Sequence, residues 1–154
     1  MKTILAPIDF SPVSKRIVEE AAELARLLNA RLFLLHIVPP PIVTQSEYVT
    51  KKGAEFAALT VGSMAEALKK FARPLEATGL VVNTESVLGF PGETILEKAR
   101  KLKPDYIVVG SHGHGAFYDL IIGGTTSRIL KRAGCPVIVV PAEKRMKKSG
   151  NGSR

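Results

Sequence analysis

The chain has 154 residues, of which 45% are hydrophobic and 23% are charged, so it is long enough to bury one sizeable core. No apolar run approaches the ~18 residues that span a membrane, and a single cysteine, Cys135, excludes an internal disulfide. The net charge is +8, but half of it lies in residues 142–154, which hold five Lys or Arg and one Glu. We therefore expect a single cytoplasmic domain at residues 1–141 and a basic, disordered tail at 142–154, rather than a nucleic-acid-binding surface.

The first part of the chain predicts a strand, a helix and a second strand. Residues 2–9 read as a strand, and Ser11 followed by Pro12 predicts an N-cap with proline at the first helical position. The helix then carries apolar residues at steps of three and four, namely Val13, Ile17, Ala21, Leu24 and Leu28. Residues 31–38 are almost all apolar, which is typical of a strand buried on both faces of a parallel sheet.

The middle of the chain predicts a loop, a helix and an edge strand. Residues 42–53 are expected to form the loop. The helix after it has a stripe with the spacing of core packing, namely Ala57, Val61, Met64, Leu68, Phe71 and Leu75. Pro74 should kink or end this helix, and Gly79 should close it. Residues 80–88 resemble a strand that is more polar than the others, as an edge strand would be.

Two helix–strand units complete the pattern. Residues 91–102 predict a short helix with basic residues in its last turn, and residues 105–110 predict a buried strand. Residues 126–134 read as a helix ending in glycine, and residues 135–141 as a final apolar strand. Strands and helices thus alternate throughout, which favours an α/β fold with a doubly wound parallel sheet and helices on both faces.

In such a sheet, ligands bind at the carboxyl ends of the strands, where the strand order reverses. The residues at these ends are 7–9, 36–38 and 109–110. The last of these opens the most unusual stretch of the chain, residues 108–128, which holds two of the three histidines and five of the thirteen glycines. A metal site, a catalytic site and a phosphate-binding loop are the three interpretations to weigh.

The first two interpretations find little support in the spacing. His112 and His114, even with His36 from another strand, match no recognised set of metal ligands. Ser111 stands in Gly-Ser-His-Gly, which is not the nucleophile-elbow pattern. Cys135 precedes a proline at the start of a strand and is expected to be a packing residue.

Phosphate binding fits the residue types better, because glycines let backbone N–H groups approach an anion and a helix N-terminus adds partial positive charge. The residues concerned are Gly110, Gly113 and Gly115 on one side of the loop and Gly123, Gly124, Thr125 and Thr126 just before the last helix. Neither a P-loop nor a dinucleotide-binding GxGxxG motif is present. A glycine-rich turn with positive φ angles explains the same residues, so the pattern alone leaves both interpretations open.

The sequence resembles the universal stress protein family over nearly its whole length, from Lys2 to Pro141. The segments that carry the resemblance are ILAPIDFSP, FLLHIV, GFPGETILEKARKLKPDYIVVGSHG and CPVIVV. ATP-binding members of the family have a G-x2-G-x9-G-[S/T] motif, and Gly110, Gly113 and Gly123 stand at these spacings. The resemblance implies a Rossmann-like (adenine nucleotide alpha hydrolase-like) sandwich of five parallel strands in the order 3-2-1-4-5.

The resemblance also implies where ATP, with or without Mg²⁺, would bind. Pro7, Ile8 and Asp9 would border the nucleoside, and the backbone of Ile37 would face the adenine. Ribose and phosphates would lie against Val109 and the loop that contains Gly110, His112, Gly113, His114 and Gly115. The outer phosphates would lie against Gly123, Gly124, Thr125 and Thr126. One departure weakens the match, since Gly124 replaces the final Ser or Thr of the motif.

The function implied is that of an ATP-binding cytoplasmic stress-response or regulatory protein. A stress-linked interaction module that binds no nucleotide is the alternative, because part of the family lacks the motif. No general base stands out near the loop, so at most a slow ATPase is expected. The family also pairs its last strands, and the apolar strand from Pro136 to Val140 predicts a homodimer through this edge. Neither a membrane span nor a nucleic-acid partner is expected.

Overall fold

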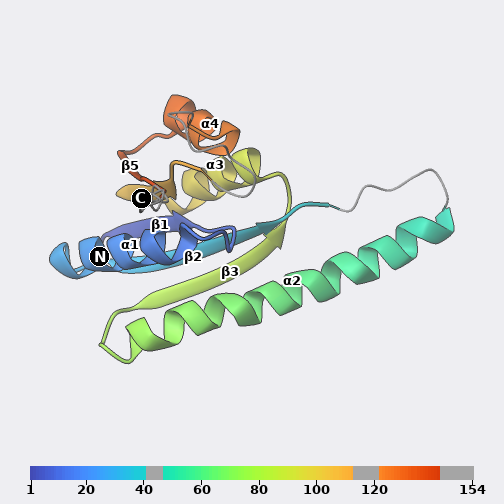
Figure 1. Cartoon of the computed structure of the whole chain (residues 1–154), viewed down its shortest axis with the longest axis horizontal. Helices are drawn as coiled ribbons and strands as arrows, with labels where there is room; N and C mark the ends of the chain where they lie inside the picture. The colour runs from blue at the N-terminus through green and yellow to red at the C-terminus, as the bar shows by residue number, and fades with distance from the viewer. Residues whose placement is uncertain (41–46, 113–121, 143–154) are drawn as a thin grey trace, which may run out of the picture.

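The computed structural model describes residues 1–40, 47–112 and 122–142 of the chain, with only the backbone at residues 47–52. The elements are β1 (Thr3–Pro7), α1 (Ser14–Leu27), β2 (Arg31–Val38), α2 (Glu47–Glu76), β3 (Val82–Leu88), α3 (Pro91–Leu102), β4 (Tyr106–Gly110), α4 (Gly124–Arg132) and β5 (Val137–Val140). The five strands form one sheet in the order β3-β2-β1-β4-β5, and every neighbouring pair is parallel (Figure 1). The expected fold and strand order are therefore confirmed.

The helices cover the two faces of the sheet in pairs, α1 and α2 on one face and α3 and α4 on the other (Figure 1). Successive residues of a strand point to opposite faces, so each buried strand contributes to two separate cores. In β1, Ile4 and Ala6 pack with α1, whereas Leu5 packs with Ile95 of α3 and Ile129 of α4. This double burial explains why the β1, β2 and β4 sequences read as continuous apolar runs.

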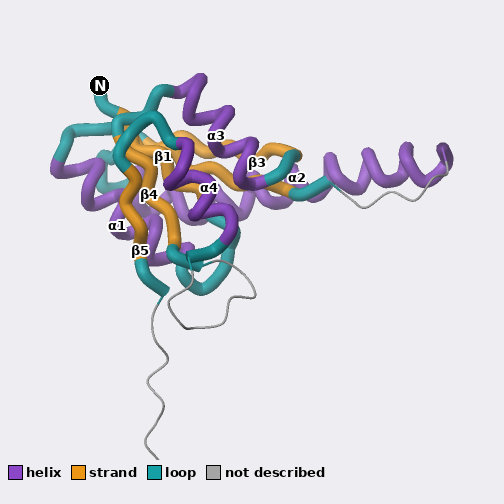
Figure 2. The backbone as a smooth tube through the Cα atoms, turned by 90° about the horizontal axis from the view of Figure 1, so that it is seen from above, coloured by secondary structure: helices purple, strands orange, loops and turns teal. Residues whose placement is uncertain are grey.

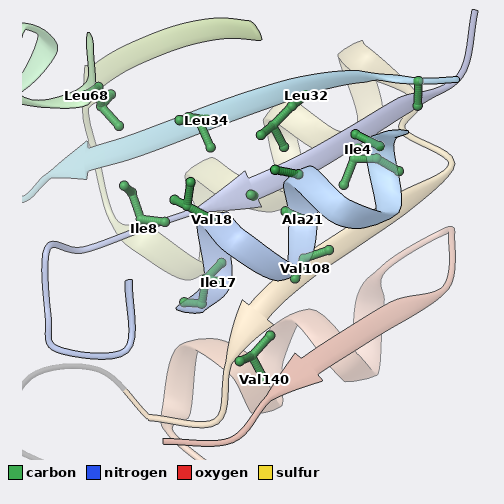
Figure 3. Close-up of a cluster of buried hydrophobic side chains, with 14 of the residues drawn as sticks. Ile4, Ile8, Ile17, Val18, Ala21, Leu32, Leu34, Leu68, Val108 and Val140 are labelled. Atoms are coloured by element: carbon green, nitrogen blue, oxygen red, sulfur yellow. The ribbon is translucent and has the colours of Figure 1, made fainter. Parts of the chain in front are cut away.

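The core under α1 and α2 is the larger of the two clusters (Figure 3). Ile17, Val18 and Ala21 on one face of α1 lie over Ile4 of β1 and Val108 of β4. Leu68 is the fully buried anchor of α2 in this core. The predicted stripe of α1 therefore faces the sheet, and so does the second half of the α2 stripe, namely Leu68, Phe71 and Leu75.

The prediction of a loop over residues 42–53 was wrong in its second half, because α2 begins at Glu47. The apolar stripe that reveals this helix in the sequence starts only at Ala57, so the earlier turns gave no periodic signal. Figures 1 and 2 show the first turns of α2 extending past the ends of the strands. At the other end Pro74 stands inside the last turn, and Gly79, with φ of +86°, closes the connection to β3.

The predicted N-cap of α1 was also wrong. The helix begins at Ser14 with Val13 as its N-cap, and no side chain of the described residues caps it. Ser11 instead forms a turn, in which its C=O accepts a hydrogen bond of 2.9 Å from the N–H of Ser14. The last helix starts at Gly124, two residues earlier than the sequence predicted, and ends at Arg132.

Candidate functional site

A cavity of about 480 Å³ opens at the carboxyl ends of β1 and β4. Chain connectivity reverses direction between these two strands, which is where ligands bind doubly wound sheets. All the predicted site residues that the structure describes line this cavity, namely Pro7, Ile8, Asp9, Ile37, Val109, Gly110, His112, Gly123, Gly124, Thr125 and Thr126. Gly113, His114 and Gly115 lie outside the described residues.

The interior of the cavity is apolar, and its apolar residues were not singled out from the sequence. They are Ile17, Leu35, Pro91, Ile95 and Ile129. Four of them occupy core positions of helices or strands, so their periodicity is fully explained by packing. They give the cavity an apolar surface that suits a flat hydrophobic group such as a nucleobase.

The turn after β1 fixes the position of Asp9. Its Oδ1 accepts hydrogen bonds from the backbone N–H of Ser11 at 2.9 Å and from the hydroxyl of Ser14 at 3.2 Å. The carbonyl of Ile8 accepts a hydrogen bond of 2.9 Å from Nδ1 of the buried His36. Asp9 is thus a turn-forming residue that also lines the cavity, and His36 supports the same turn.

Phe10 completes the support of this turn. It is one of the few non-glycine residues with positive φ, at 59°. Its ring lies 4.6 Å from the ring of His36 and 5.9 Å from that of Phe71 in α2, measured between centroids. A strained backbone conformation held by aromatic packing is the kind of feature found at binding turns.

The backbone of Ile37 presents a donor and an acceptor to the same end of the sheet. Along β2, Leu35 accepts from the N–H of Ile8 on the β1 side, whereas Val38 accepts from the N–H of Gly89 on the β3 side, each at 2.9 Å. Ile37, two residues beyond Leu35, therefore turns its N–H and C=O toward β1, whose ladder has ended. Beyond that ladder, no described residue takes either group in a backbone hydrogen bond.

The N-terminus of α4 forms the wall opposite Asp9. Gly123 is the N-cap, with φ of −58° and ψ of 154°, and among the described residues no side chain caps the helix. The N–H groups of Gly124, Thr125 and Thr126 have no intrahelical partner, as in any first turn. These N–H groups and the helix dipole make this wall electropositive.

The hydroxyls on this wall have different roles. Thr126 is buried, and its Oγ1 donates a 2.7 Å hydrogen bond to the carbonyl of Gly110. This bond joins α4 to the end of β4, so the Thr126 hydroxyl has a structural role. Thr125 is exposed and lines the cavity. A Cβ added to Gly124 would meet no atom of the described residues within 4 Å, which leaves room for a side chain at that position.

Ser111 joins the cavity wall to the last strand. Its N–H donates to the carbonyl of Val140 at 2.8 Å, and its hydroxyl accepts from the N–H of Ala142 at 3.1 Å. On the cavity side, its carbonyl accepts from the N–H of Gly123 at 2.9 Å, and its hydroxyl shares a 2.9 Å hydrogen bond with Nδ1 of His112. One residue therefore contacts β5, the α4 N-cap and a cavity histidine.

The structure also bears on two other kinds of site considered from the sequence, a reactive cysteine and a metal centre. Cys135 does not line the cavity, and burial together with the charge of Asp105 raises the pKa of its thiol, which disfavours the reactive thiolate. In the part of the chain that the structure describes, no three His, Cys, Asp or Glu side chains come together as metal ligands.

None of the described helices is long and apolar enough to cross a membrane.

Comparison with known proteins gives matches over nearly the whole chain. A family model described as the universal stress protein family matches residues 1–141. Universal stress protein MJ0531 of Methanocaldococcus jannaschii is 32% identical over 146 residues, which cover 94% of this chain and 84% of that protein. Universal stress protein UspA from Lactobacillus plantarum has a TM-score of 0.81 at 25% identity, over 90% of this chain and 97% of that one.

A more distant solved structure carries a ligand. A protein of the same family from Arabidopsis thaliana, with AMP bound, has a TM-score of 0.64 at 17% identity and covers 97% of both chains. At that identity the likeness concerns the fold.

Proposed function

Because the chain belongs to the universal stress protein family, we propose that it is a cytoplasmic regulatory protein that binds ATP in the cavity between β1 and β4. The observation that carries this proposal is the meeting of two features around one cavity of about 480 Å³. One is the open backbone donor and acceptor of Ile37, and the other is the electropositive N-terminus of α4. The AMP bound to the related Arabidopsis thaliana protein supports the same class of ligand.

In this proposal each part of the nucleotide meets a matching part of the chain. The adenine edge pairs with the N–H and C=O of Ile37, and the ring lies against the apolar lining of the cavity. Asp9 accepts from the ribose hydroxyls. The phosphates receive hydrogen bonds from the first-turn N–H groups of α4 and from the hydroxyl of Thr125.

In this proposal the nucleotide phosphates supply most of the Mg²⁺ ligands, because the described cavity lining offers one carboxylate. Asp9 is the only carboxylate among the described residues that line the cavity, and it is held by the turn after β1. Mg²⁺ prefers several oxygen ligands and is commonly bound by one or two carboxylates together with substrate phosphates. We therefore infer that ATP is held rather than turned over rapidly.

Calorimetric titration of the purified chain with ATP, AMP and GTP tests the proposal. Saturable binding of ATP at a stoichiometry of one per chain is the expected result, with GTP weaker because its Watson–Crick edge is mismatched to the Ile37 backbone. An absence of heat and of thermal stabilisation at millimolar ATP would refute nucleotide binding and favour the interaction module that binds no nucleotide. The specific support for that alternative is the missing hydroxyl at Gly124. Rapid multiple turnover would instead make the chain an enzyme.

Gly124→Ser is expected to tighten ATP binding about tenfold. A hydroxyl at this position would donate to a phosphate oxygen, and a hydrogen bond to a charged group is worth roughly 1.5–3 kcal/mol. The substitution fits sterically, since among the described residues nothing lies within 4 Å of the added Cβ. Gly134→Ser is the matched control, because Gly134 is equally unobstructed but does not line the cavity. Equal ATP affinities for Gly124→Ser and wild type would show that position 124 does not face the phosphates.

We also propose a homodimer formed by the paired β5 edges from Pro136 to Val140. β5 is the last strand of the sheet, and its Ile138 side chain is 37% exposed. An apolar edge with unpaired backbone groups is a template for strand pairing. Ile138→Lys is expected to shift sedimentation equilibrium at micromolar concentration toward the 16.6 kDa monomer. Val81→Lys is the control, because Val81 directly precedes β3 at the opposite edge of the sheet, and it should leave the association unchanged. A wild-type chain that is already monomeric would contradict the proposal.

A further inference from the structure

Arg128 connects the two helix N-termini that border the cavity. It lies one turn after Gly124 in α4, and its Nη1 donates to Oε1 of Glu93, in the first turn of α3, at 2.8 Å. Its aliphatic stem lies over Gly92, where an added Cβ would come within 2.8 Å of Cδ of Arg128. Gly92 follows Pro91, which lines the cavity. The stem of Arg128 can lie there because residue 92 has no side chain, and its helix places it one turn from Gly124, which lines the cavity.

We propose that Arg128 is a phosphate-binding residue of this site, and that its guanidinium exchanges Glu93 for the terminal phosphate of a bound nucleoside triphosphate. The inference rests on the proposed function and adds a specificity-determining residue to it. Glu93 holds the guanidinium near the α4 N-terminus while no phosphate is bound. The ligand class selected would be nucleotides with more than one phosphate.

The exposure of the Arg128–Glu93 pair and the chemistry of phosphate both favour this exchange. The pair is exposed, with 47% of the Arg128 side chain and 62% of the Glu93 side chain accessible, and such surface pairs contribute little to stability and are easily broken. A phosphate carries more charge than a carboxylate and suits the planar donors of arginine, which can bind it in a bidentate manner.

Apart from the hydroxyl of Thr125, the described first turn of α4 offers the cavity few side-chain donors. Gly124 has no hydroxyl, and the hydroxyl of Thr126 already donates to Gly110. Of the side chains in the first two turns of α4, Arg128 is the one that carries a positive charge. An arginine at this place would replace the electrostatic contribution that the motif's missing Ser or Thr cannot make.

The test compares Arg128→Gln with Glu93→Gln, using ATP and AMP as ligands in calorimetric titrations of the full chain. Arg128→Gln is expected to weaken ATP binding about tenfold, the effect of losing one charged hydrogen bond, and to change AMP binding less than about twofold. Glu93→Gln is expected to tighten ATP binding about two- to fivefold, because the competing carboxylate is removed. Arg128→Lys should retain part of the ATP preference.

A purely structural ion pair predicts a different pattern. Both Gln variants remove the same charge pair, so a brace between α3 and α4 would weaken ATP and AMP binding in both variants. That outcome, or unchanged ATP affinity in Arg128→Gln, would overturn the role of Arg128 while leaving nucleotide binding intact. If the wild-type chain binds neither nucleotide, the proposed function fails, and this inference fails with it. Urea unfolding of each variant verifies that it is folded.

Discussion

Ile129→Ala is expected to lower the free energy of unfolding by about 2–5 kcal/mol, the range for truncating a fully buried isoleucine. Ile129 has no exposed surface and packs in one cluster with Ile95 of α3 and Leu5 of β1. α4 has only nine residues, and Ile129 and Thr126 are its buried ones. The substitution therefore removes most of the apolar contact that holds α4 on the sheet, and urea unfolding followed by circular dichroism measures the loss.

The adjacent residue provides the control. Leu130 is 42% exposed, so Leu130→Ala should change the free energy of unfolding by far less than Ile129→Ala. Because Ile129 also lines the cavity, Ile129→Ala should weaken ATP binding, whereas Leu130→Ala should not. Equal destabilisation by the two alanines would mean that α4 is not anchored through its inner face, and the described position of the α4 N-terminus at the cavity would then be wrong.

Gly110→Val is expected to cost about 3 kcal/mol of stability, at the upper end of typical overpacking effects, and to abolish nucleotide binding. An added Cβ alone would lie 2.9 Å from Cγ1 of Val13 and 3.1 Å from both Cδ1 of Ile17 and the carbonyl oxygen of His112. Valine adds two methyl groups in the same crowded place. The side chains of Val13 and Ile17 or the backbone of His112 must shift, and Ile17 and His112 line the cavity.

Gly134→Val makes the same chemical change where the described residues leave the Cβ unobstructed, so it should be nearly neutral. Thermal unfolding and ATP titration of both variants separate the steric effect from the general cost of replacing glycine. A Gly110→Val protein as stable as wild type would show that α1 and β4 are packed less closely than described. Gly110→Ala should fall between wild type and Gly110→Val in both measurements.

The sequence predicted the fold well because its strands are buried on both faces. Residues 31–38 and 105–110 are continuous apolar runs between helical stripes, and this combination occurs almost only in parallel sheets covered by helices. The strand order came from the family resemblance, since alternation alone does not set it. The errors fell on helix ends: the early turns of α2 carry no apolar stripe, and Ser11 was assigned as an N-cap from residue type although its backbone forms a turn.

The lining of the cavity was predicted where residues carry a local signal and missed where they do not. Asp9, Gly110 and Gly123 stand at strand ends or motif positions, which local sequence reveals. Leu35 and Ile129 look like any core residue, because burial imposes the same pattern on a cavity floor as on a packed interior. Contacts between residues far apart in the chain give no signal in the local sequence. Examples are the Arg128–Glu93 pair and the hydrogen bond from Thr126 to Gly110.

The position of Ser111 has a thermodynamic consequence. Its backbone and hydroxyl bind the end of β5 on one side and the α4 N-cap and His112 on the other, so the proposed strand pairing and the proposed ligand binding would both act on one residue. If a ligand in the cavity shifts Ser111, the two equilibria are thermodynamically coupled, and the coupling is reciprocal. ATP binding must then change the dissociation constant of the dimer by a certain factor, and dimer formation must change the affinity for ATP by the same factor. Nucleotide concentration would then be converted into a degree of association, and apparent ATP affinity would depend on the concentration of the protein itself.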